Sequence, residues 1–176
     1  MIMEGYNIPD ATFYMLKDSV YGEGCSIAPP EIEAKRASEL FAGKKVIIFG
    51  LPGAFTPTCS NSQLPGFEEL YQDFEAKGVD EIWCTSVNDA FVMDAWATLS
   101  GAKNVKMLPD GNADFARSLG TSVYKSNLGF GERSWRYTML VDDMEIKRVW
   151  SEDNQMSYDP KDPYEKSDPY EVIKAL

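Results

Sequence analysis

The sequence predicts an α/β fold in which helices cover a mixed central β-sheet. Residues 45–51, KVIIFGL, contain four consecutive apolar residues, which is typical of a central strand covered on both faces. Residues 81–87, EIWCTSV, have the same character, and residues 136–143 and 145–150 predict two adjacent strands joined by a turn. With helices between these strands, the order fits an α/β sandwich, predicted as a single domain over residues 1–176.

The N-terminal part of the chain is predicted to contribute a strand, a turn-rich segment and a short helix. Residues 11–18, ATFYMLKD, mix aromatic and polar residues as a half-buried strand does. Residues 19–32 are rich in turn-forming residues and predict a hairpin or a loop. Residues 38–45, SELFAGKK, predict a short helical turn that ends at Gly43.

A longer helix is predicted to begin at Pro57. Apolar residues follow it at steps of three and four, which produces one apolar stripe. They are Leu64, Phe67, Leu70, Tyr71 and Phe74. The pair Pro65-Gly66 falls inside this stripe and predicts a kink or break, because proline lacks the N–H that a helix interior uses.

A helix and a short strand are predicted after the second central strand. Residues 88–101, NDAFVMDAWATLSG, predict the helix, with Asn88 as its N-cap and Gly101 near its end. Residues 105–111, VKMLPDG, predict the short strand and a turn.

The C-terminal third is predicted to contain two more helices and a long loop. Residues 112–120, NADFARSLG, predict a helix bounded by Asn112 and Gly120. Residues 151–169 are polar and rich in proline, so we expect a long surface loop there. Residues 169–176, PYEVIKAL, predict a final helix.

Charge and composition exclude several classes of partner. The formal net charge is -11 and the sequence pI is about 4.5, so the chain lacks the basic stripe of a nucleic-acid binder. An anionic membrane surface would repel it, and no apolar run approaches the ~20 residues that span a bilayer. The N-terminus lacks the basic and apolar regions of a signal peptide. We expect a cytoplasmic protein with no nucleic-acid or membrane partner.

The chain contains no histidine, which excludes Ser-His-Asp and Cys-His catalysis and the common zinc sites. Its cysteines, Cys25, Cys59 and Cys84, are too few and too scattered for a secreted disulfide framework. The acidic residues in 142–145 are expected to form a solvated turn rather than a metal site. We therefore expect neither a metal nor a bound cofactor, and any nucleophile must be activated without an imidazole.

Residues 50–60, GLPGAFTPTCS, place Cys59 directly after a predicted helix start. Thr56-Pro57 is typical of such a start, with threonine as N-cap and proline in the first helical position. Backbone N–H groups in the first turn have no intrahelical partner, and the helix dipole is positive there, so a thiolate is stabilised. The turn also lies at the end of a strand, where open α/β sheets place their sites. We predict that Cys59 is reactive.

The other two cysteines are expected to have no catalytic role. Cys84 lies in the middle of a predicted strand between Trp83 and Thr85, so we expect a buried core residue. Cys25 lies in a glycine-containing loop, where an incidental exposed thiol is expected.

The segment PGAFTPTCS carries the Pro-x-x-x-Thr-x-x-Cys pattern of peroxiredoxins, through Pro52, Thr56 and Cys59. Four segments in order, KKVIIFGLPGAFTPTCS, LPGFEELY, SVNDAFVMDAW and GFGERSWRYTMLV, resemble the peroxiredoxin 5 (type II) subfamily. The resemblance extends from about residue 3 to the C-terminus, nearly the whole chain. It implies a thioredoxin-like fold and thiol-dependent reduction of hydrogen peroxide and organic hydroperoxides.

The resemblance also implies roles for individual residues. Cys59 falls on the peroxidatic cysteine, and Thr56 on the hydroxyl that contacts sulfur and peroxide. Pro52 falls on the proline that shields the thiolate. Arg136 falls on the active-site arginine, with Arg133 as the second choice for that role. Backbone N–H groups of the first helical turn are expected to stabilise the developing charge together with the arginine.

The oxidised cysteine must then be reduced. Some members of the subfamily carry a resolving cysteine in the C-terminal loop, but residues 151–169 contain none. Cys84 is expected to be too buried to attack Cys59, and Cys25 reaches it only if its loop folds over the site. We therefore expect a one-cysteine cycle, with glutathione and a glutaredoxin as reductant and thioredoxin as the alternative. The resemblance also implies a homodimer.

Two other functions remain open from the sequence. Residues 59–62, CSNS, match C-x-x-S, the one-thiol form of the motif of thiol–disulfide oxidoreductases, although this leaves Thr56 and Arg136 without a role. A non-enzymatic redox sensor would share the reactive Cys59 and would differ in needing a docking surface for its partner.

Overall fold

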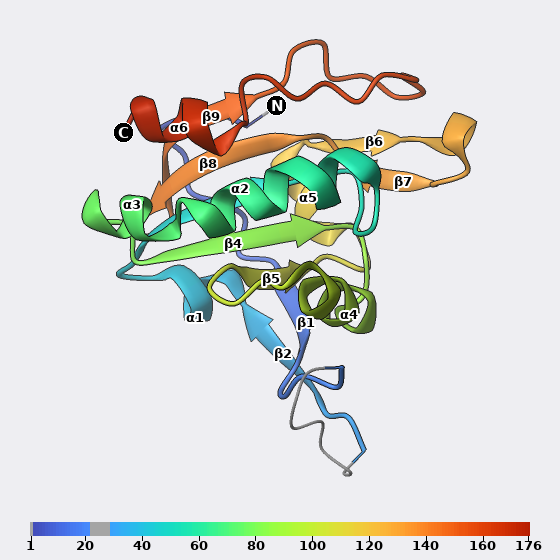
Figure 1. Cartoon of the computed structure of the whole chain (residues 1–176), viewed down its shortest axis with the longest axis horizontal. Coiled ribbons are helices and arrows are strands. Elements are labelled where there is room, and N and C mark those ends of the chain that lie inside the picture. Colours follow the sequence, from blue (N-terminus) through green and yellow to red (C-terminus); the bar gives the residue numbers. More distant parts are fainter. Residues whose placement is uncertain (1, 22–28) are drawn as a thin grey trace.

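The computed structural model describes residues 2–21 and 29–176, so Cys25 lies outside the described residues. A five-stranded sheet forms its centre (Figure 1). The strands lie side by side in the order β5 (Lys106–Pro109), β4 (Glu81–Ser86), β3 (Lys45–Gly50), β8 (Tyr137–Asp142) and β9 (Glu145–Ser151). β3, β4 and β5 are parallel, whereas β8 pairs antiparallel with both β3 and β9. The predicted mixed central sheet is confirmed.

β3 is the middle strand of the sheet, as its apolar sequence predicts. Its residues from Val46 to Phe49 are all fully buried. Because side chains alternate along a strand, Ile47 and Phe49 pack into one core cluster, and Val46 and Ile48 pack into another. Both faces of the sheet are therefore covered.

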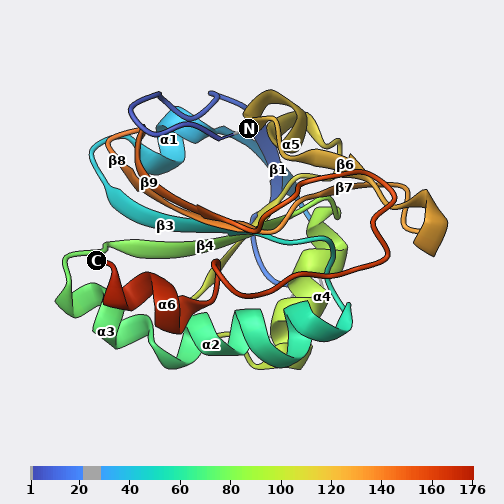
Figure 2. The ribbon, with the colours of Figure 1, turned by 90° about the horizontal axis from the view of Figure 1, so that it is seen from above.

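Helices cover both faces of this sheet (Figure 2). One face packs against α2 (Leu64–Glu69), α3 (Tyr71–Ala76), α4 (Ala90–Ser100) and α6 (Pro169–Lys174). The other face is covered by α1 (Ala37–Phe41), α5 (Asp114–Leu119) and β1 (Thr12–Leu16). The short helix at 38–45 and the C-terminal helix are both confirmed. Within the described residues, no helix is long and apolar enough to cross a membrane.

Two small antiparallel ribbons add to the central sheet. β1 pairs with β2 (Ile32–Arg36), which confirms the predicted strand and joins the two ends of the turn-rich segment. β6 (Ser122–Tyr124) pairs with β7 (Glu132–Ser134) around the short 3-10 helix η2 (Ser126–Leu128). The sequence does not predict this second ribbon, because each strand has only 3 residues and lacks apolar alternation.

The helix predicted to begin at Pro57 does begin there. After its first two residues it contains a π-helical turn, η1 (Cys59–Gln63), in which the N–H of Leu64 donates to the carbonyl of Cys59. This turn contains one more residue than an α-helical turn, and it lies where the side chain of Cys59 enters the core. α2 then continues the same helix.

The helix does not break at Pro65-Gly66, because α2 runs through both residues, and the irregularity nearest to the predicted kink or break is the π turn that ends at Gln63. Pro65 is tolerated in the first turn of α2, since the π turn before it has already displaced the hydrogen-bond register. A Cβ on Gly66 would lie 2.7 Å from Cγ of Pro169, so this glycine lets α6 approach α2. The helix is interrupted later, at Leu70, which separates α2 from α3.

Asn88 is not the N-cap of α4, contrary to the prediction. Asp89 takes that position, and its carboxylate accepts two backbone N–H groups of the first turn at 2.9 and 3.0 Å. The side-chain oxygen of Asn88 instead accepts from the N–H of Ala54 at 3.0 Å and from the hydroxyl of Ser86 at 2.7 Å. Asn88 thus ties β4 to the turn that follows β3. Gly101 ends the helix in a left-handed conformation, as predicted.

Asn112 lies two residues before α5, close to the predicted boundary of the helix. Ala113 occupies the N-cap position with φ 59°, and the carboxylate of Asp110 accepts two N–H groups of the first turn at 3.0 and 2.9 Å. Gly120 ends the helix as predicted. Burial raises the pKa of Asp110 to about 6, although these hydrogen bonds act in the opposite direction.

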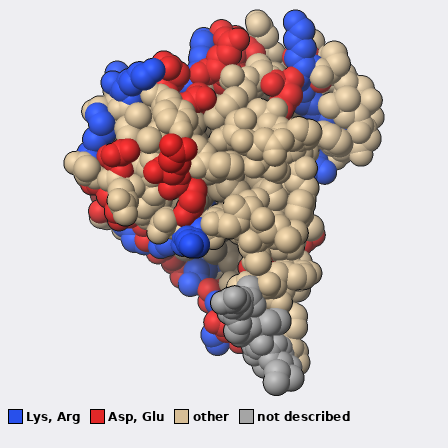
Figure 3. Space-filling model, viewed as in Figure 1, with Lys and Arg blue, Asp and Glu red and all other residues tan. Residues whose placement is uncertain are grey.

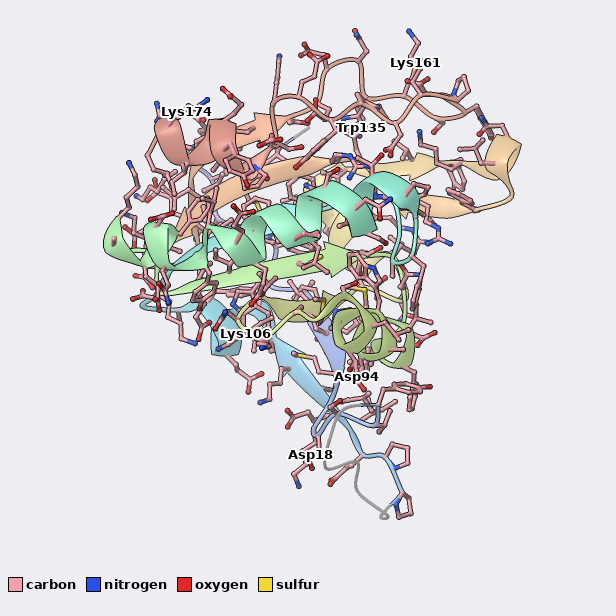
Figure 4. The ribbon with its side chains drawn as sticks, viewed as in Figure 1. Asp18, Asp94, Lys106, Trp135, Lys161 and Lys174 are labelled. Carbon is pink, nitrogen blue, oxygen red and sulfur yellow. The ribbon has the colours of Figure 1, made fainter. Side chains whose placement is uncertain are left out.

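The polar segment 151–169 follows the surface as predicted, but it is firmly anchored. The carboxylate of buried Glu152 accepts from the N–H of Glu165 at 3.0 Å, and from the N–H and hydroxyl of Ser167 at 2.9 and 2.7 Å. Trp135 lies beneath this segment (Figure 4), and its indole N–H donates to the carbonyl of Glu152 at 2.9 Å.

The raised pKa of Asp110 predicts that the free energy of unfolding decreases as pH rises. Its pKa rises from 3.8 to about 6 on folding, so between these values the folded state holds a proton that the unfolded state has lost. The stabilisation is complete below pH 3.8 and is lost as pH approaches 6. Relative to Asp110→Asn, the wild-type free energy of unfolding should fall by about 3 kcal/mol across this range.

Urea unfolding of the wild type and of Asp110→Asn at several pH values measures the difference in their free energies of unfolding. Asp153→Asn is the control, because its carboxylate is 68% exposed and lies on the loop between β9 and α6, and it should leave the pH profile unchanged. Parallel profiles for wild type and Asp110→Asn would contradict the prediction.

Candidate active site

Cys59 lies in the first turn of the helix that follows β3, as predicted. The helix begins at Pro57, and its first hydrogen bond runs from the N–H of Ser60 to the carbonyl of Thr56 at 3.0 Å. The N–H groups of Thr58 and Cys59 precede that bond, so they point out of the helix end. The side chain of Cys59 is fully buried.

Hydrogen bonds fix the turn between β3 and Cys59. The hydroxyl of Thr56 donates to the carbonyl of Gly53 at 2.8 Å. Pro52 is buried, and its carbonyl accepts from Nη1 of Arg133 at 3.4 Å. A Cβ at position 53 would lie 2.9 Å from the same nitrogen, so glycine allows this close approach. Pro52 and Thr56 are thus held in place beside the cysteine.

Arg136 lies directly before β8, and strand pairing brings it to Cys59. Gly50 at the end of β3 pairs with Tyr137 at the start of β8 in antiparallel register. Nη1 of Arg136 therefore donates to Sγ of Cys59 at 3.3 Å, although the two residues are 77 positions apart. Arg136 is only 1% exposed. The structure places these two predicted site residues in direct contact.

Gln63 is a neighbour of the site that the sequence did not identify. Its side-chain oxygen accepts from the same Nη1 of Arg136 at 2.5 Å, and its side chain is fully buried. Its amide nitrogen has no hydrogen-bond partner among the described residues. Gln63 lies four positions after Cys59, on the same side of the helix. The sequence did offer one signal for Gln63, which is a polar residue four positions after Cys59 on a helix that faces the core.

The loop between β9 and α6 supplies a second set of contacts that the sequence did not identify. Asp162 forms an ion pair with Nη2 of Arg136, and the carbonyl of Pro163 accepts from its Nε at 3.1 Å. The guanidinium carbon lies 5.6 Å from the centre of the Tyr164 ring. No sequence pattern marked these residues, because their role depends on where a long loop passes.

Arg133, the second candidate for the active-site arginine, contacts backbone rather than sulfur. Its Nη1 lies 3.4 Å from the carbonyls of both Pro52 and Val87. Its Nε donates to the carbonyl of Phe130 at 2.9 Å, and the guanidinium lies over the Phe130 ring at 5.6 Å. Arg133 therefore supports the turn that carries Pro52.

The charges of the site affect both arginines. Burial lowers the pKa of Arg136, but the negative charges of Cys59 and Asp162 raise it, and the net change is upward. Burial also lowers the pKa of Arg133, and here it outweighs the opposing effect of Cys59. Arginine remains protonated in proteins in either case, so both residues are permanent cations.

Cys84 lies in the core on β4, as expected. It is fully buried and belongs to the same apolar cluster as Cys59. Burial raises the pKa of the Cys84 thiol well above its usual value, and the nearby charge of Cys59 adds to the rise. Cys84 is therefore held as a neutral thiol, the poorly nucleophilic form.

A cavity of about 240 Å³ opens beside the turn and the helix start. It is lined by Pro52, Thr56, Pro57, Thr58, Lys125, Leu128, Phe130, Lys161 and Asp162. It thus borders two predicted site residues, while Cys59 itself stays buried. Larger cavities of about 370 and 800 Å³ lie elsewhere, and their linings include none of the predicted site residues.

The site offers sulfur, hydroxyl and guanidinium groups rather than metal ligands. Among the described residues, no group of three or more cysteines and carboxylates is arranged to hold a metal ion. On the face shown in Figure 3, acidic and basic side chains are interspersed without a continuous basic stripe. The chemistry available to Cys59 is nucleophilic attack by sulfur beside a fixed cation.

Comparisons with known proteins agree with this arrangement. The Redoxin family model matches residues 4–166. The chain is 54% identical to "Peroxiredoxin sll1621" of Synechocystis sp. over 137 residues, which cover 78% of this chain and 72% of that protein.

Two solved structures resemble the chain along almost its full length. The Plasmodium falciparum antioxidant protein, a 1-Cys peroxiredoxin, is 30% identical with a TM-score of 0.90, covering 99% of this chain and 98% of that one. Reduced Prx3 of Vibrio vulnificus in complex with H2O2 is 38% identical with a TM-score of 0.84, covering 99% of each chain. The chain therefore belongs to the Redoxin family, among the peroxiredoxins, and it is a thiol-dependent peroxidase.

Proposed function

We propose that Cys59 is the peroxidatic cysteine and that the enzyme reduces hydrogen peroxide and organic hydroperoxides. The observation that carries the proposal is the 3.3 Å contact between Nη1 of Arg136 and Sγ of Cys59. A permanent cation beside a cysteine sulfur favours the thiolate, which is the nucleophilic form. The V. vulnificus relative, whose reduced form was solved with H2O2, supports the choice of substrate.

In the proposed first step, the Cys59 thiolate attacks one peroxide oxygen. An S–O bond forms, the O–O bond breaks, and the departing oxygen takes a proton and leaves as water or an alcohol. Cys59 becomes a sulfenic acid. Negative charge develops on the departing oxygen, and Arg136 and the N–H groups of Thr58 and Cys59 are the donors placed to stabilise it.

Thr56 and Pro52 are proposed to complete the site. The single O–H of Thr56 is donated to the carbonyl of Gly53, so its oxygen lone pairs are available to accept from the peroxide. Pro52 has no N–H to offer, and its buried ring shields the sulfur from water. Both residues border the 240 Å³ cavity, which supports peroxide entry from that side.

We propose a one-cysteine cycle for the second half of the reaction. An external thiol attacks the Cys59 sulfenic acid, which forms a mixed disulfide and releases water; a second thiol then attacks that disulfide and restores Cys59 as the thiol. The buried, neutral Cys84 supports the choice of an external thiol. So does the 1-Cys description of the P. falciparum relative. The proposed reductant is glutathione with a glutaredoxin, and thioredoxin is the alternative.

The remaining parts of the proposal concern assembly and location. We propose a homodimer in the cytoplasm that needs no bound cofactor or metal and has no nucleic-acid or membrane partner. The net charge of -11 supports the lack of a nucleic-acid partner. The chemistry above requires only Cys59 and an external thiol, which supports the lack of a cofactor.

Peroxide oxidation of the reduced protein, followed by stopped-flow fluorescence, tests the role of Cys59. The indole of Trp96 donates to the hydroxyl of Ser60 at 3.0 Å and so reports on the neighbourhood of Cys59. We expect the wild type to react orders of magnitude faster than free cysteine, and Cys59→Ser to show no reaction. Cys84→Ala is the matched control and should keep the wild-type rate. A wild-type rate no higher than that of free cysteine would contradict the proposed role of Cys59.

Mass spectrometry of the oxidised protein tests the one-cysteine cycle. After one equivalent of peroxide, we expect dimedone to label Cys59, and glutathione to form a mixed disulfide with the same residue. Cys84→Ala should give the same products. A disulfide between Cys59 and either Cys84 or Cys25 would contradict the one-cysteine cycle.

A further inference from the structure

Three consecutive residues of the loop between β9 and α6 converge on the guanidinium of Arg136. Asp162 pairs with Nη2, the carbonyl of Pro163 accepts from Nε, and the ring of Tyr164 lies over the guanidinium. The remaining nitrogen, Nη1, is shared by Cys59 and Gln63. The loop therefore contacts the guanidinium on the side opposite the sulfur.

The loop is anchored on both sides of these three residues. Upstream, Nζ of buried Lys125 donates to the carbonyls of Asp159 and Lys161 at 3.0 and 3.2 Å. Downstream, Glu152 accepts the hydrogen bonds of Glu165 and Ser167. The side chain of Lys161 points away from the protein (Figure 4), so its backbone is what the anchor holds. Asp162 is therefore presented to Arg136 by a fixed backbone.

Arg136 needs a stable counter-charge, because its side chain is only 1% exposed. Among the described residues, Asp162 is the carboxylate within ion-pairing distance of it. The other negative charge, the Cys59 thiolate, is consumed when the sulfur is oxidised. A planar guanidinium held at Nη1 alone can rotate about that contact, whereas contacts at Nη2 and Nε fix its plane.

We propose that Asp162 is a positioning residue for the peroxide reaction. It holds the guanidinium of Arg136 so that Nη1 faces the sulfur and the attacked peroxide. Asp162 acts through Arg136 and makes no bond to the reacting atoms. This inference rests on the proposed role of Cys59 and Arg136, and it adds a residue from a loop that carries no recognisable motif.

A double-mutant cycle between Asp162 and Arg136 tests the proposal. We expect Asp162→Ala to lower the second-order rate with hydrogen peroxide about tenfold, because a misplaced catalytic group loses rate steeply. Asp162→Asn keeps an acceptor oxygen without the charge, so its rate should fall between wild type and Asp162→Ala. Lysine has a single side-chain nitrogen and therefore no counterpart of Nη2, the atom that pairs with Asp162. In an Arg136→Lys background, the Asp162 changes should therefore lower the rate no further.

Asp153→Ala is the matched control, because this carboxylate lies on the same loop and pairs with exposed Lys166. It should keep the wild-type rate. Thermal unfolding shows which variants are folded. If Asp162→Ala is unstable, the near-isosteric Asp162→Asn takes its place in the double-mutant cycle.

The outcomes separate this inference from the proposed function. A slow wild-type reaction would overturn the proposed function and the positioning role together. A fast wild type with an unaffected Asp162→Ala would overturn the positioning role alone. Equal losses from the Asp162 changes in both backgrounds would also overturn it, because they would indicate a general effect on the loop.

Discussion

The contact between the Arg136 guanidinium and the Cys59 sulfur places a permanent positive charge inside the protein, and the rest of the site depends on stabilising it there. A buried cation is costly unless its charge and its donors are matched. Gln63, Pro163 and Asp162 provide acceptors for its nitrogens, and the sulfur provides the remaining one. Since the chain contains no histidine, we propose that this cation takes the place of the imidazole that activates the nucleophile in other cysteine enzymes.

The sheet makes this contact possible. Gly50 and Tyr137 are paired across β3 and β8, so the helix that follows one strand meets the residue that precedes the other. A Cβ on Gly50 would lie 2.4 Å from the Tyr137 ring, so the two strands approach closely at this point. The scaffold thus fixes the sulfur and the cation on rigid elements, while the loop that carries Asp162 is fixed by its own anchors.

Local sequence predicted the parts of the site that depend on local structure. Thr56-Pro57 predicted the helix start, and the family pattern identified Cys59 and Arg136, which the structure brings together. Gln63 and Asp162 were missed, because their importance comes from contacts with a residue distant in the sequence. The cap at Asn88 was predicted wrongly for a related reason. Two adjacent residues could cap the helix, and Asn88 is instead engaged by the turn after β3.

The central claim is that Arg136 stabilises the attack on peroxide as well as the thiolate. The most direct test compares Arg136→Ala with wild type in two reactions of Cys59. One is oxidation by hydrogen peroxide, and the other is alkylation by iodoacetamide, which needs the thiolate but breaks no O–O bond. The account predicts that the peroxide rate falls about 10²-fold or more, well beyond the loss in alkylation. Equal losses in the two reactions would contradict it.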